Sequence, residues 1–398
     1  MAWLPRPHGT ESGTVTITRT RQAPASPPRA LLAVCYFANV DRFAVTPLLV
    51  VIAAAMHAPL SDVTLAASGY AFAYGGSQVV WGLLSDRFGR LPVLRIALLG
   101  AGLSGLASTV APTLAVLIAL RILTGAFVGA IVPASIGYVG DAVAPRVRQR
   151  ALSDLMAATG SATATATLIA GVVARFTSWR VVFAIPAIAL GLLMPALRRL
   201  PEPVRASGGT HYRDLLHNRW LPLVLLLGFV EGGLLLGGVT YLAPALQHDG
   251  MGLAAAGALA ATYGIGVLSG TRIVKPLSVR LPAWALLSIG GALLVGGFTA
   301  MAASQSAVAL TLSAVILGGA YSFMHSTLQT WSTSVLPRAR GTAVALFTAA
   351  LFGGSAASTV AVAPLASEGR FGLMFALGAV LGVPLALAAA LGRARCRE

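Results

Sequence analysis

The sequence predicts an all-α membrane protein whose twelve transmembrane helices form two pseudo-symmetric bundles of six. Hydrophobic residues make up 57% of its 398 positions and charged residues only 10%, whereas soluble domains carry about 25% charged residues. Its mean hydropathy is +0.81. Long apolar segments alternate with short polar ones along the whole chain. This composition cannot cover a surface that faces water, and it excludes an ordinary soluble enzyme.

Each apolar segment is interpreted as one transmembrane helix, because a helix needs about 20 apolar residues to cross the bilayer. The only internal stretch polar enough to join two domains runs from Leu200 to Arg219, with six segments before it and six after it. The segments lie at 30–56, 64–85, 92–110, 112–140, 150–174, 180–199, 219–246, 253–274, 283–304, 306–335, 341–366 and 370–392. The predicted domains are a disordered cytoplasmic tail at 1–29, a bundle at 30–199, a cytoplasmic linker at 200–218, a second bundle at 219–392 and a cytoplasmic tail at 393–398.

The distribution of basic residues predicts the orientation of these helices. The net charge is +16, but the basic residues occur in small groups between apolar segments, so they do not form the continuous patch that nucleic acid requires. With a cytoplasmic N-terminus, the cytoplasmic segments hold 23 basic residues and the external loops hold three. Such an excess is typical of cytoplasmic loops. We therefore predict a multi-pass protein of the inner (plasma) membrane with both termini in the cytoplasm and no nucleic-acid partner.

The two halves share a sequence feature at corresponding positions. The segment 144–148 (APRVR) follows the fourth predicted helix, and 336–340 (LPRAR) follows the tenth. Each is the predicted cytoplasmic turn that leads into the fifth helix of its half. Parallel repeats of this kind are typical of transporters in which two bundles move around a central site.

Other chemistries lack the residues that they need. Cys35 and Cys396 do not suggest a disulfide framework, and no Cys/His cluster has the spacing of a metal site. The segment Gly100–Gly105 fits a dinucleotide-binding pattern, but it lies within an apolar segment and no strand precedes it. There is no G-x-x-x-x-G-K loop for ATP. We therefore expect no metal and no cofactor, and we expect an ion gradient as the energy source. A membrane-embedded enzyme would need clustered catalytic side chains, and the sequence offers only isolated candidates.

The turn between the second and third predicted helices carries the most informative motif. It reads G-L-L-S-D-R-F-G-R-L-P-V-L from Gly82 to Leu94, and it resembles the G-x-L-x-D-R-x-G-R-[RK]-x-x-L signature of the major facilitator superfamily. Leu91 stands where a basic residue is usual. The resemblance implies that family's twelve-helix fold over residues 30–392, and a monomer whose partners are a small-molecule substrate and the lipid bilayer. The residues that carry the motif are Gly82, Asp86, Arg87, Gly89 and Arg90.

These motif residues predict a gate on the cytoplasmic side. Gly89 tolerates the positive φ that a short turn needs, and Asp86 can accept hydrogen bonds from an arginine or a helix N-terminus. In the resembled family this carboxylate holds the two halves together when the transporter faces outward. Its partners here would include the start of the eleventh helix, near Gly341 and Thr342. The alternative is a cluster that only sets topology, but such a cluster has no use for an aspartate.

Two further motifs bear on the branch of the family. Residues 121–125 (RILTG) resemble the R-x-x-Q-G motif of proton-coupled members, with Thr124 in place of the glutamine. A Gly-Pro pair typical of antiporters would fall on Ala166 and Thr167, and only Gly171 remains of the glycine pair that follows it. The chain thus resembles the twelve-helix drug:proton antiporters, although the second motif weakens that assignment.

Three charged residues fall near the middle of the bilayer. Counted along their helices, Asp41, Glu231 and Arg121 lie about 16, 18 and 14 Å from the membrane surface. Charges at this depth are costly, so we expect them to face a cavity and to be paired. Burial raises the pKa of a carboxyl group and a nearby arginine lowers it. We predict that Asp41 exchanges protons, that Arg121 modulates it and that Glu231 is a second titrating or cation-binding group. The alternative is an Asp41–Arg121 pair that only orients its two helices.

Polar and aromatic residues on other helices are candidates for the substrate cavity. Arg42 faces about 100° away from Asp41, and it either binds an anionic group of the substrate or pairs elsewhere. His325 lies about 28 Å along the tenth helix, which favours a gate or packing role. Aromatic and amide groups suit amphipathic organic solutes, but such stripes are just as often packing. The cavity candidates are Arg42, Tyr70, Tyr74 and Gln78 from the first two helices and His325 and Gln329 from the tenth.

The function that these observations predict is secondary active transport. The leading hypothesis is proton-coupled efflux of small hydrophobic or amphipathic organic compounds, drugs or metabolites, by alternating access. The alternative is an importer or facilitator of a small nutrient such as a sugar or an organic acid. The eroded Gly-Pro motif favours import, and the scarcity of polar groups in the bundle argues against a sugar.

Overall fold

The computed structural model describes residues 28–203, 218–336 and 340–396, and these residues form helices joined by short turns. Eleven helical segments are long and apolar enough to cross a membrane. The twelfth crossing is α3 (Leu60–Phe88), which has 29 residues but is more polar than the others. The predicted all-α, twelve-helix fold class is confirmed. The predicted tail residues 1–27, 397 and 398, most of the predicted linker (204–217) and the turn residues 337–339 lie outside the described residues.

The first half of the chain makes six crossings, of which the first and the fourth consist of consecutive shorter helices. The first is interrupted by a turn of 3-10 helix that begins at Thr46 and contains Pro47. The crossings are α1 (Arg29–Ala44), η1 (Thr46–Leu48) and α2 (Leu49–Met56); α3; α4 (Arg90–Thr109); α5 (Leu114–Val128) and α6 (Ile131–Ala142); α7 (Pro145–Phe176); and α8 (Trp179–Arg198).

The second half makes six more crossings, and its first crossing is interrupted as well. The glycine-rich stretch after Glu231 forms a π-helical and then a 3-10 segment. The crossings are α9 (Leu221–Gly232), η3 (Gly233–Gly237), η4 (Gly238–Tyr241) and α10 (Leu242–His248); α11 (Leu253–Ala260) and α12 (Thr262–Arg280); α13 (Ala283–Ala303); α14 (Ala307–Val335); α15 (Arg340–Ser367); and α16 (Phe371–Arg395).

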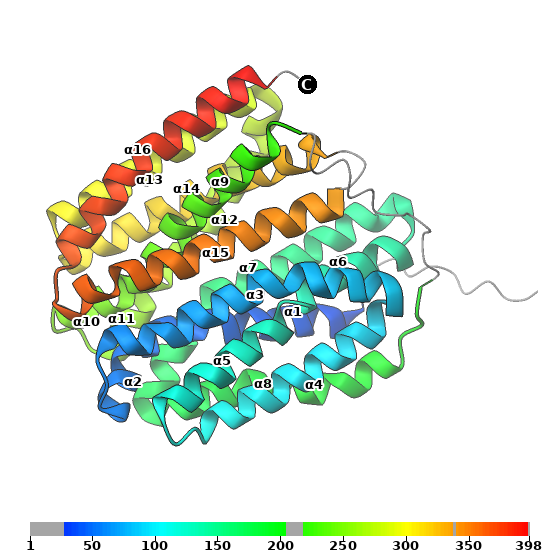
Figure 1. The fold of residues 1–398 in the computed structure, drawn as a ribbon, viewed down its shortest axis with the longest axis horizontal. Coiled ribbons are helices and arrows are strands. Elements are labelled where there is room, and N and C mark those ends of the chain that lie inside the picture. Colours follow the sequence, from blue (N-terminus) through cyan, green and yellow to red (C-terminus); the bar gives the residue numbers. More distant parts are fainter. Residues whose placement is uncertain (1–27, 204–217, 337–339, 397–398) are drawn as a thin grey trace, which may run out of the picture.

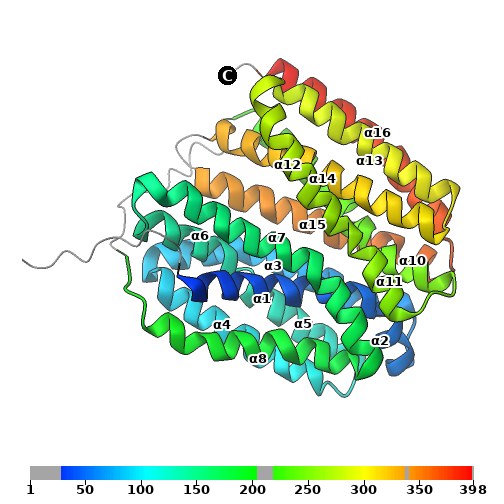
Figure 2. The ribbon, with the colours of Figure 1, turned by 180° about the vertical axis from the view of Figure 1, so that it is seen from behind.

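The two halves form two bundles that lie side by side (Figures 1 and 2). Helices α3 and α15 run along each other at the boundary, and α7 lies beside α11. Each bundle has its own buried core, with Leu94 and Tyr138 in the first and Phe347 and Phe375 in the second. Large apolar side chains elsewhere are exposed, as the 67% exposure of Phe72 illustrates. Exposed apolar side chains of this kind suit contact with lipid.

The bundles are joined tightly at one end, which we name the closed end. It holds the turns α2–α3, α10–α11 and α15–α16 and lies opposite the end where the described helices start and finish (Figure 1). Here Gln247 Nε2 donates to the carbonyl oxygen of Pro47 over 3.1 Å, and the backbone N–H of Ser61 donates to Ser367 Oγ over 2.9 Å. Each hydrogen bond joins one half to the other.

Two glycines allow α7 and α11 to approach closely near the closed end. A Cβ atom on Gly257 would lie 2.9 Å from the carbonyl oxygen of Thr167 and 3.2 Å from the Cα atom of Gly171. Because the nearest atoms are backbone atoms, they cannot rotate away. The absence of both side chains is therefore a condition for this contact between the halves.

We predict that Gly257→Val separates the two halves at the closed end. Overpacking of this kind costs about 1–3 kcal/mol, and moving the bundles apart relieves it. Double electron–electron resonance between spin labels at Ala58→Cys and Asp249→Cys, with Cys35 and Cys396 replaced, should show longer distances. Gly296→Val is the matched control, because a Cβ atom there meets no atom within 4 Å. An unchanged distance distribution in Gly257→Val would contradict the prediction.

Candidate functional site

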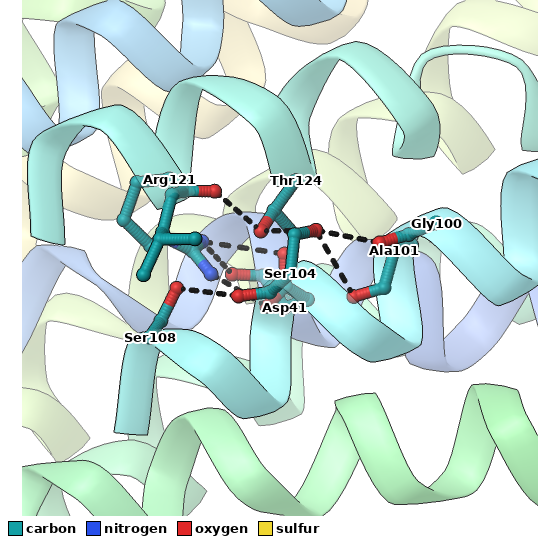
Figure 3. Close-up of polar contacts among 8 residues, drawn as sticks. Asp41, Gly100, Ala101, Ser104, Ser108, Arg121 and Thr124 are labelled. Atoms are coloured by element: carbon teal, nitrogen blue, oxygen red, sulfur yellow. Dashed lines mark hydrogen bonds and ion pairs between the residues drawn. The ribbon is translucent and has the colours of Figure 1, made fainter. Parts of the chain in front are cut away.

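A buried ion pair joins the first and fourth crossings of the first half. Arg121 Nη1 donates to Asp41 Oδ1 over 2.8 Å, and Arg121 Nη2 lies 3.2 Å from Asp41 Oδ2 (Figure 3). The same nitrogen also donates to the backbone carbonyl of Asp41 over 3.1 Å. The side chains are 0% and 2% exposed for Arg121 and Asp41. The structure thus brings together the two residues that the sequence placed at similar depths.

Aromatic rings cover the guanidinium group of Arg121. Its Cζ atom lies 4.6 Å from the ring centre of Tyr70 and 4.5 Å from that of Phe183. Such cation–π contacts stabilise a positive charge away from water. Tyr70 also lines the central cavity described below. One aromatic ring therefore contacts both the cavity and the ion pair.

Hydroxyl groups connect α5 to α4 beside the ion pair. Thr124 Oγ1 lies 2.9 Å from Ser104 Oγ, and Ser104 Oγ donates to the carbonyl oxygen of Gly100 over 2.7 Å (Figure 3). Ser108 in turn donates to the carbonyl of Ser104 over 2.9 Å. The short Thr124, which stands where the resembled motif has glutamine, thus reaches a neighbouring helix. Ser104 was not among the predicted site residues, since a serine in an apolar helix commonly bonds only to its own backbone.

A second acid–base pair lies in the second half. Glu231 is completely buried in α9, and its Oε1 atom lies 3.6 Å from Nδ1 of His325 in α14. Neither carboxylate oxygen has a hydrogen-bond partner among the described residues. The His325 ring stacks on Tyr321, with 4.5 Å between ring centres. The imidazole is 18% exposed, whereas its Nδ1 atom, which faces the carboxylate, is buried.

The length of α14 explains why the sequence did not predict this pair. The helix has 29 residues, or about 44 Å, and so exceeds the hydrocarbon core of about 30 Å. Counted from the first residue of α14, His325 lies near the cytoplasmic end of the helix. Glu231 lies ten residues after Leu221, where α9 begins, and His325 lies ten residues before Val335, where α14 ends. Counted from that end of the bundle, the two residues therefore lie at the same depth.

The two pairs occupy equivalent places in the two halves. Each joins the first crossing of its half to the fourth, and each acid lies shortly before the point where its helix is interrupted. π-helical turns frequently occur at functional sites, and the one at Gly233–Gly237 directly follows the helix that carries Glu231.

A cavity of about 90 Å³, which we name the central cavity, lies between the two halves. Arg42 is the only charged residue among the described residues that line it. The Cζ atom of Arg42 lies 4.2 Å from the ring centre of Phe352 and 4.9 Å from that of Tyr74. Both halves contribute walls, which include Arg42, Tyr70, Thr167, Tyr263, Phe352 and Thr359.

The other predicted cavity residues lie beside this space rather than on its walls. Tyr74 is buried against Phe352, with 4.7 Å between ring centres, and contacts the cavity through Arg42. Gln78 is buried in the same helix, and His325 and Gln329 lie in α14. None of these four is among the described lining residues. Arg42 and Tyr70 are the predicted candidates that line the cavity.

The motif turn between α3 and α4 is held within the first half. Gly89 has φ of 104°, as its place in a short turn predicts. Arg90 binds Asp86 at 2.7 Å and Asp141 at 3.1 Å. The backbone N–H groups of Arg90 and Leu91 donate to the carboxylate of Glu202 over 2.5 and 3.0 Å. A carboxylate at a helix N-terminus is favourable.

In this structure Asp86 pairs within its own half; the contact with the start of α15, expected when the transporter faces outward, stays a prediction. The side chain of Asp86 is 59% exposed and pairs with Arg90 of its own half, and among the described residues no hydrogen bond joins it to α15. A Cβ atom on Gly82 or on Gly341 would meet no atom within 4 Å. Arg87 places its guanidinium 5.4 Å from the ring centre of Phe88.

Twelve crossings in two equivalent bundles, with a cavity between them and motif residues at the turn, define a membrane transporter. A sequence model of the Major Facilitator Superfamily matches residues 31–359, so the chain belongs to that family and is not an enzyme. The resemblance of the motif turn is thereby confirmed at the level of the superfamily. No curated protein matches the sequence.

Solved structures of transporters share the fold. A bacterial homologue of the human lysosomal transporter Spinster, inward-facing and unoccupied, has a TM-score of 0.75 at 18% identity over 92% of this chain and 96% of its own. A D-xylose–proton symporter gives 0.73 at 18% over 90% and 94%. A mutant of the nucleoside transporter NupG gives 0.76 at 13% over 91% and 98%. At these identities the likeness is one of fold.

We predict that Arg121→Gln destabilises the protein by about 3–5 kcal/mol, because it leaves a buried carboxylate without its partner. Asp41→Asn combined with Arg121→Gln should recover most of that loss, since no lone charge remains. Thermal unfolding in detergent, followed by size-exclusion chromatography, measures both. Equal instability of the single and double variants would show that the ion pair is not the cause.

Proposed function

We propose that this transporter exports small hydrophobic or amphipathic organic compounds in exchange for protons, as a monomer in the inner membrane with both termini in the cytoplasm. The observation that carries the proposal is the buried Asp41–Arg121 pair, which one tyrosine separates from the central cavity. A carboxyl group that can gain and lose a proton at that depth is the chemical requirement for proton coupling.

Protonation of Asp41 would change the forces that act on Arg121. The guanidinium group stays charged at all relevant pH values, so it loses its counter-ion when Asp41 is neutral. It then gains from any movement that admits water or another acceptor. Tyr70, which contacts Arg121 and lines the cavity, is positioned to transmit this movement. Proton binding and access to the cavity are thereby linked.

Alternating access is supported by the difference between the two ends of the bundle. The closed end has hydrogen bonds between the halves. At the other end Asp86 pairs within its own half and is exposed. In the proposed cycle Asp86 joins the start of α15 when the closed end opens, so that only one end is open at a time. In this way the motif turn would act as the cytoplasmic gate.

Glu231 with His325 would be the second titrating pair. The carboxylate is fully buried and the imidazole 3.6 Å away is partly exposed. An imidazole can both accept and donate a proton, so His325 would be placed to pass a proton between water and the buried acid. The two pairs would then control one half each.

A second candidate function is import of a small nutrient on the same scaffold. It is favoured by the eroded antiporter motif at Ala166 and Thr167 and by the transporters of similar fold, which include a xylose–proton symporter. The apolar character of the cavity wall, with Leu235, Leu236 and Val239, argues against a sugar, which needs many hydrogen bonds. We therefore rank export first.

Transport in inverted membrane vesicles tests the proposal. Vesicles that are acidified inside should accumulate a substrate of the exporter, and addition of that substrate should release protons from the lumen. A panel of lipophilic compounds, followed with a fluorescent pH indicator, identifies the substrate. Proton and substrate movement in the same direction would instead establish import by symport.

We predict that Asp41→Asn abolishes proton-driven transport and leaves substrate binding within about threefold of wild type. The asparagine keeps the shape and can accept hydrogen bonds from Arg121 but cannot carry a proton. Substrate-induced proton release and equilibrium binding are the two measurements. Unchanged coupling in a folded Asp41→Asn variant would remove this residue from the mechanism.

We predict a weaker effect for Glu231→Gln. If the second pair modulates the first, this variant should keep proton exchange at a rate reduced about tenfold, and His325→Asn should resemble it. Initial rates of proton release over pH 5 to 8 measure the effect. Complete loss of coupling in Glu231→Gln, with normal coupling in Asp41→Asn, would exchange the roles of the two acids.

A further inference from the structure

The chemistry of the central cavity is dominated by one positive charge. Arg42 follows Asp41 in α1, but its side chain lines the space between the halves, while Asp41 is turned towards Arg121. No acidic residue is among the described residues that line the cavity. The described wall of the cavity therefore carries a net positive charge.

Arg42 has no counter-ion among the described residues. Both carboxylate oxygens of the neighbouring Asp41 lie against Arg121, and Glu231 pairs with His325. An arginine in a protein cannot lose its charge. Hence the charge of Arg42 is permanent, and no carboxylate of the structure lies within ion-pair distance of it.

Aromatic rings hold the Arg42 side chain in place without neutralising it. The Cζ atom lies 4.5 Å from the ring centre of Phe43, 4.9 Å from that of Tyr74 and 4.2 Å from that of Phe352. Cation–π contacts of this kind are attractive, and neither the rings nor the Tyr74 hydroxyl, which also interacts with the guanidinium group, supplies a negative charge, so the N–H groups at the edge of the guanidinium plane lack an anionic partner among the described residues. That edge matches the two oxygens of a carboxylate.

The rest of the wall offers little for a polar ligand. Several hydroxyl groups already donate to backbone carbonyls: Tyr263 to Leu235 over 3.0 Å and Thr240 to Leu236 over 2.8 Å. Between them the wall is formed by aliphatic residues such as Leu235 and Val239. A ligand that matches this wall combines one anionic group with an apolar body.

We propose that the central cavity binds organic anions, with a carboxylate of the substrate paired to the guanidinium group of Arg42 and its apolar part against the aliphatic wall. This inference rests on the proposed function only in taking the cavity as the transport site, and it narrows the substrate class. When such an anion leaves the cell and a proton enters, both movements carry net positive charge inward. An inside-negative membrane potential and the proton gradient therefore both drive the exchange.

Binding to purified protein in lipid nanodiscs tests the proposal. The probes are three matched compounds on one ring, benzoate, benzamide and benzylammonium, and the same three groups on naphthalene, measured by isothermal titration calorimetry. The carboxylate should bind at least tenfold more tightly than the amide of the same ring, and the ammonium compound should not compete. Equal binding within a matched set, or no carboxylate binding at millimolar concentration, would overturn the proposal.

Variants of Arg42 give the second arm of the test. Arg42→Gln should remove the preference for the carboxylate over the amide, whereas Arg42→Lys should keep the charge and part of the preference. Arg272→Gln, on an exposed part of α12, is the control that removes the same charge away from the cavity. A carboxylate preference that survives in a monodisperse Arg42→Gln sample would assign the anion to another place.

The failure of this inference can be told apart from the failure of proton exchange. Asp41→Asn should still bind the carboxylate, because its role is separate from that of Arg42. If Asp41→Asn transports normally while Arg42→Gln loses the carboxylate, the anion site stands and the proton-exchange role of Asp41 falls. If the wild-type protein exchanges protons for neutral or cationic compounds only, proton exchange stands and the anion site falls.

Discussion

A charged group inside a membrane protein has to find its partner within the protein, because the hydrocarbon supplies none. The polar interior of this transporter follows from that constraint. Arg121 is enclosed by Asp41 and two aromatic rings, and Glu231 faces His325. Each pair is complete within one bundle, so the bundles can move relative to each other without separating a pair. Arg42, placed between the bundles, is the exception, and there a ligand can supply what the protein omits.

Small residues set how closely the bundles approach. Gly171 and Gly257 bring α7 and α11 together at the closed end, while at the opposite end Asp86 and Arg90 stay within the first half. Among the described residues, hydrogen bonds between the halves thus lie at the closed end, whereas the motif residues at the opposite end pair within the first half. In the proposed cycle this difference between the two ends would be reversed when the cavity opens to the other side.

The fold could be predicted almost completely, because lipid imposes a minimum length and an apolar composition on every crossing. Pairing of Asp41 with Arg121 was foreseeable from their similar depth. Pairing of Glu231 with His325 was not foreseeable, because α14 is longer than the hydrocarbon core and the depth of His325 cannot be counted from one end of the helix. The link from Thr124 to Ser104 was hidden for another reason: helix rotation decides which serines face a neighbour, and an apolar segment of uniform composition does not reveal that rotation.

The position of Glu202 has a consequence for the connection between the bundles. This residue follows the last helix of the first half, and its carboxylate is fixed to the N-terminus of α4. The first residues after α8 are therefore fixed to the first bundle, since Tyr138 also donates to the carbonyl oxygen of Pro201. An acidic side chain from the segment after α8 thereby closes the first bundle at the turn that carries the family motif.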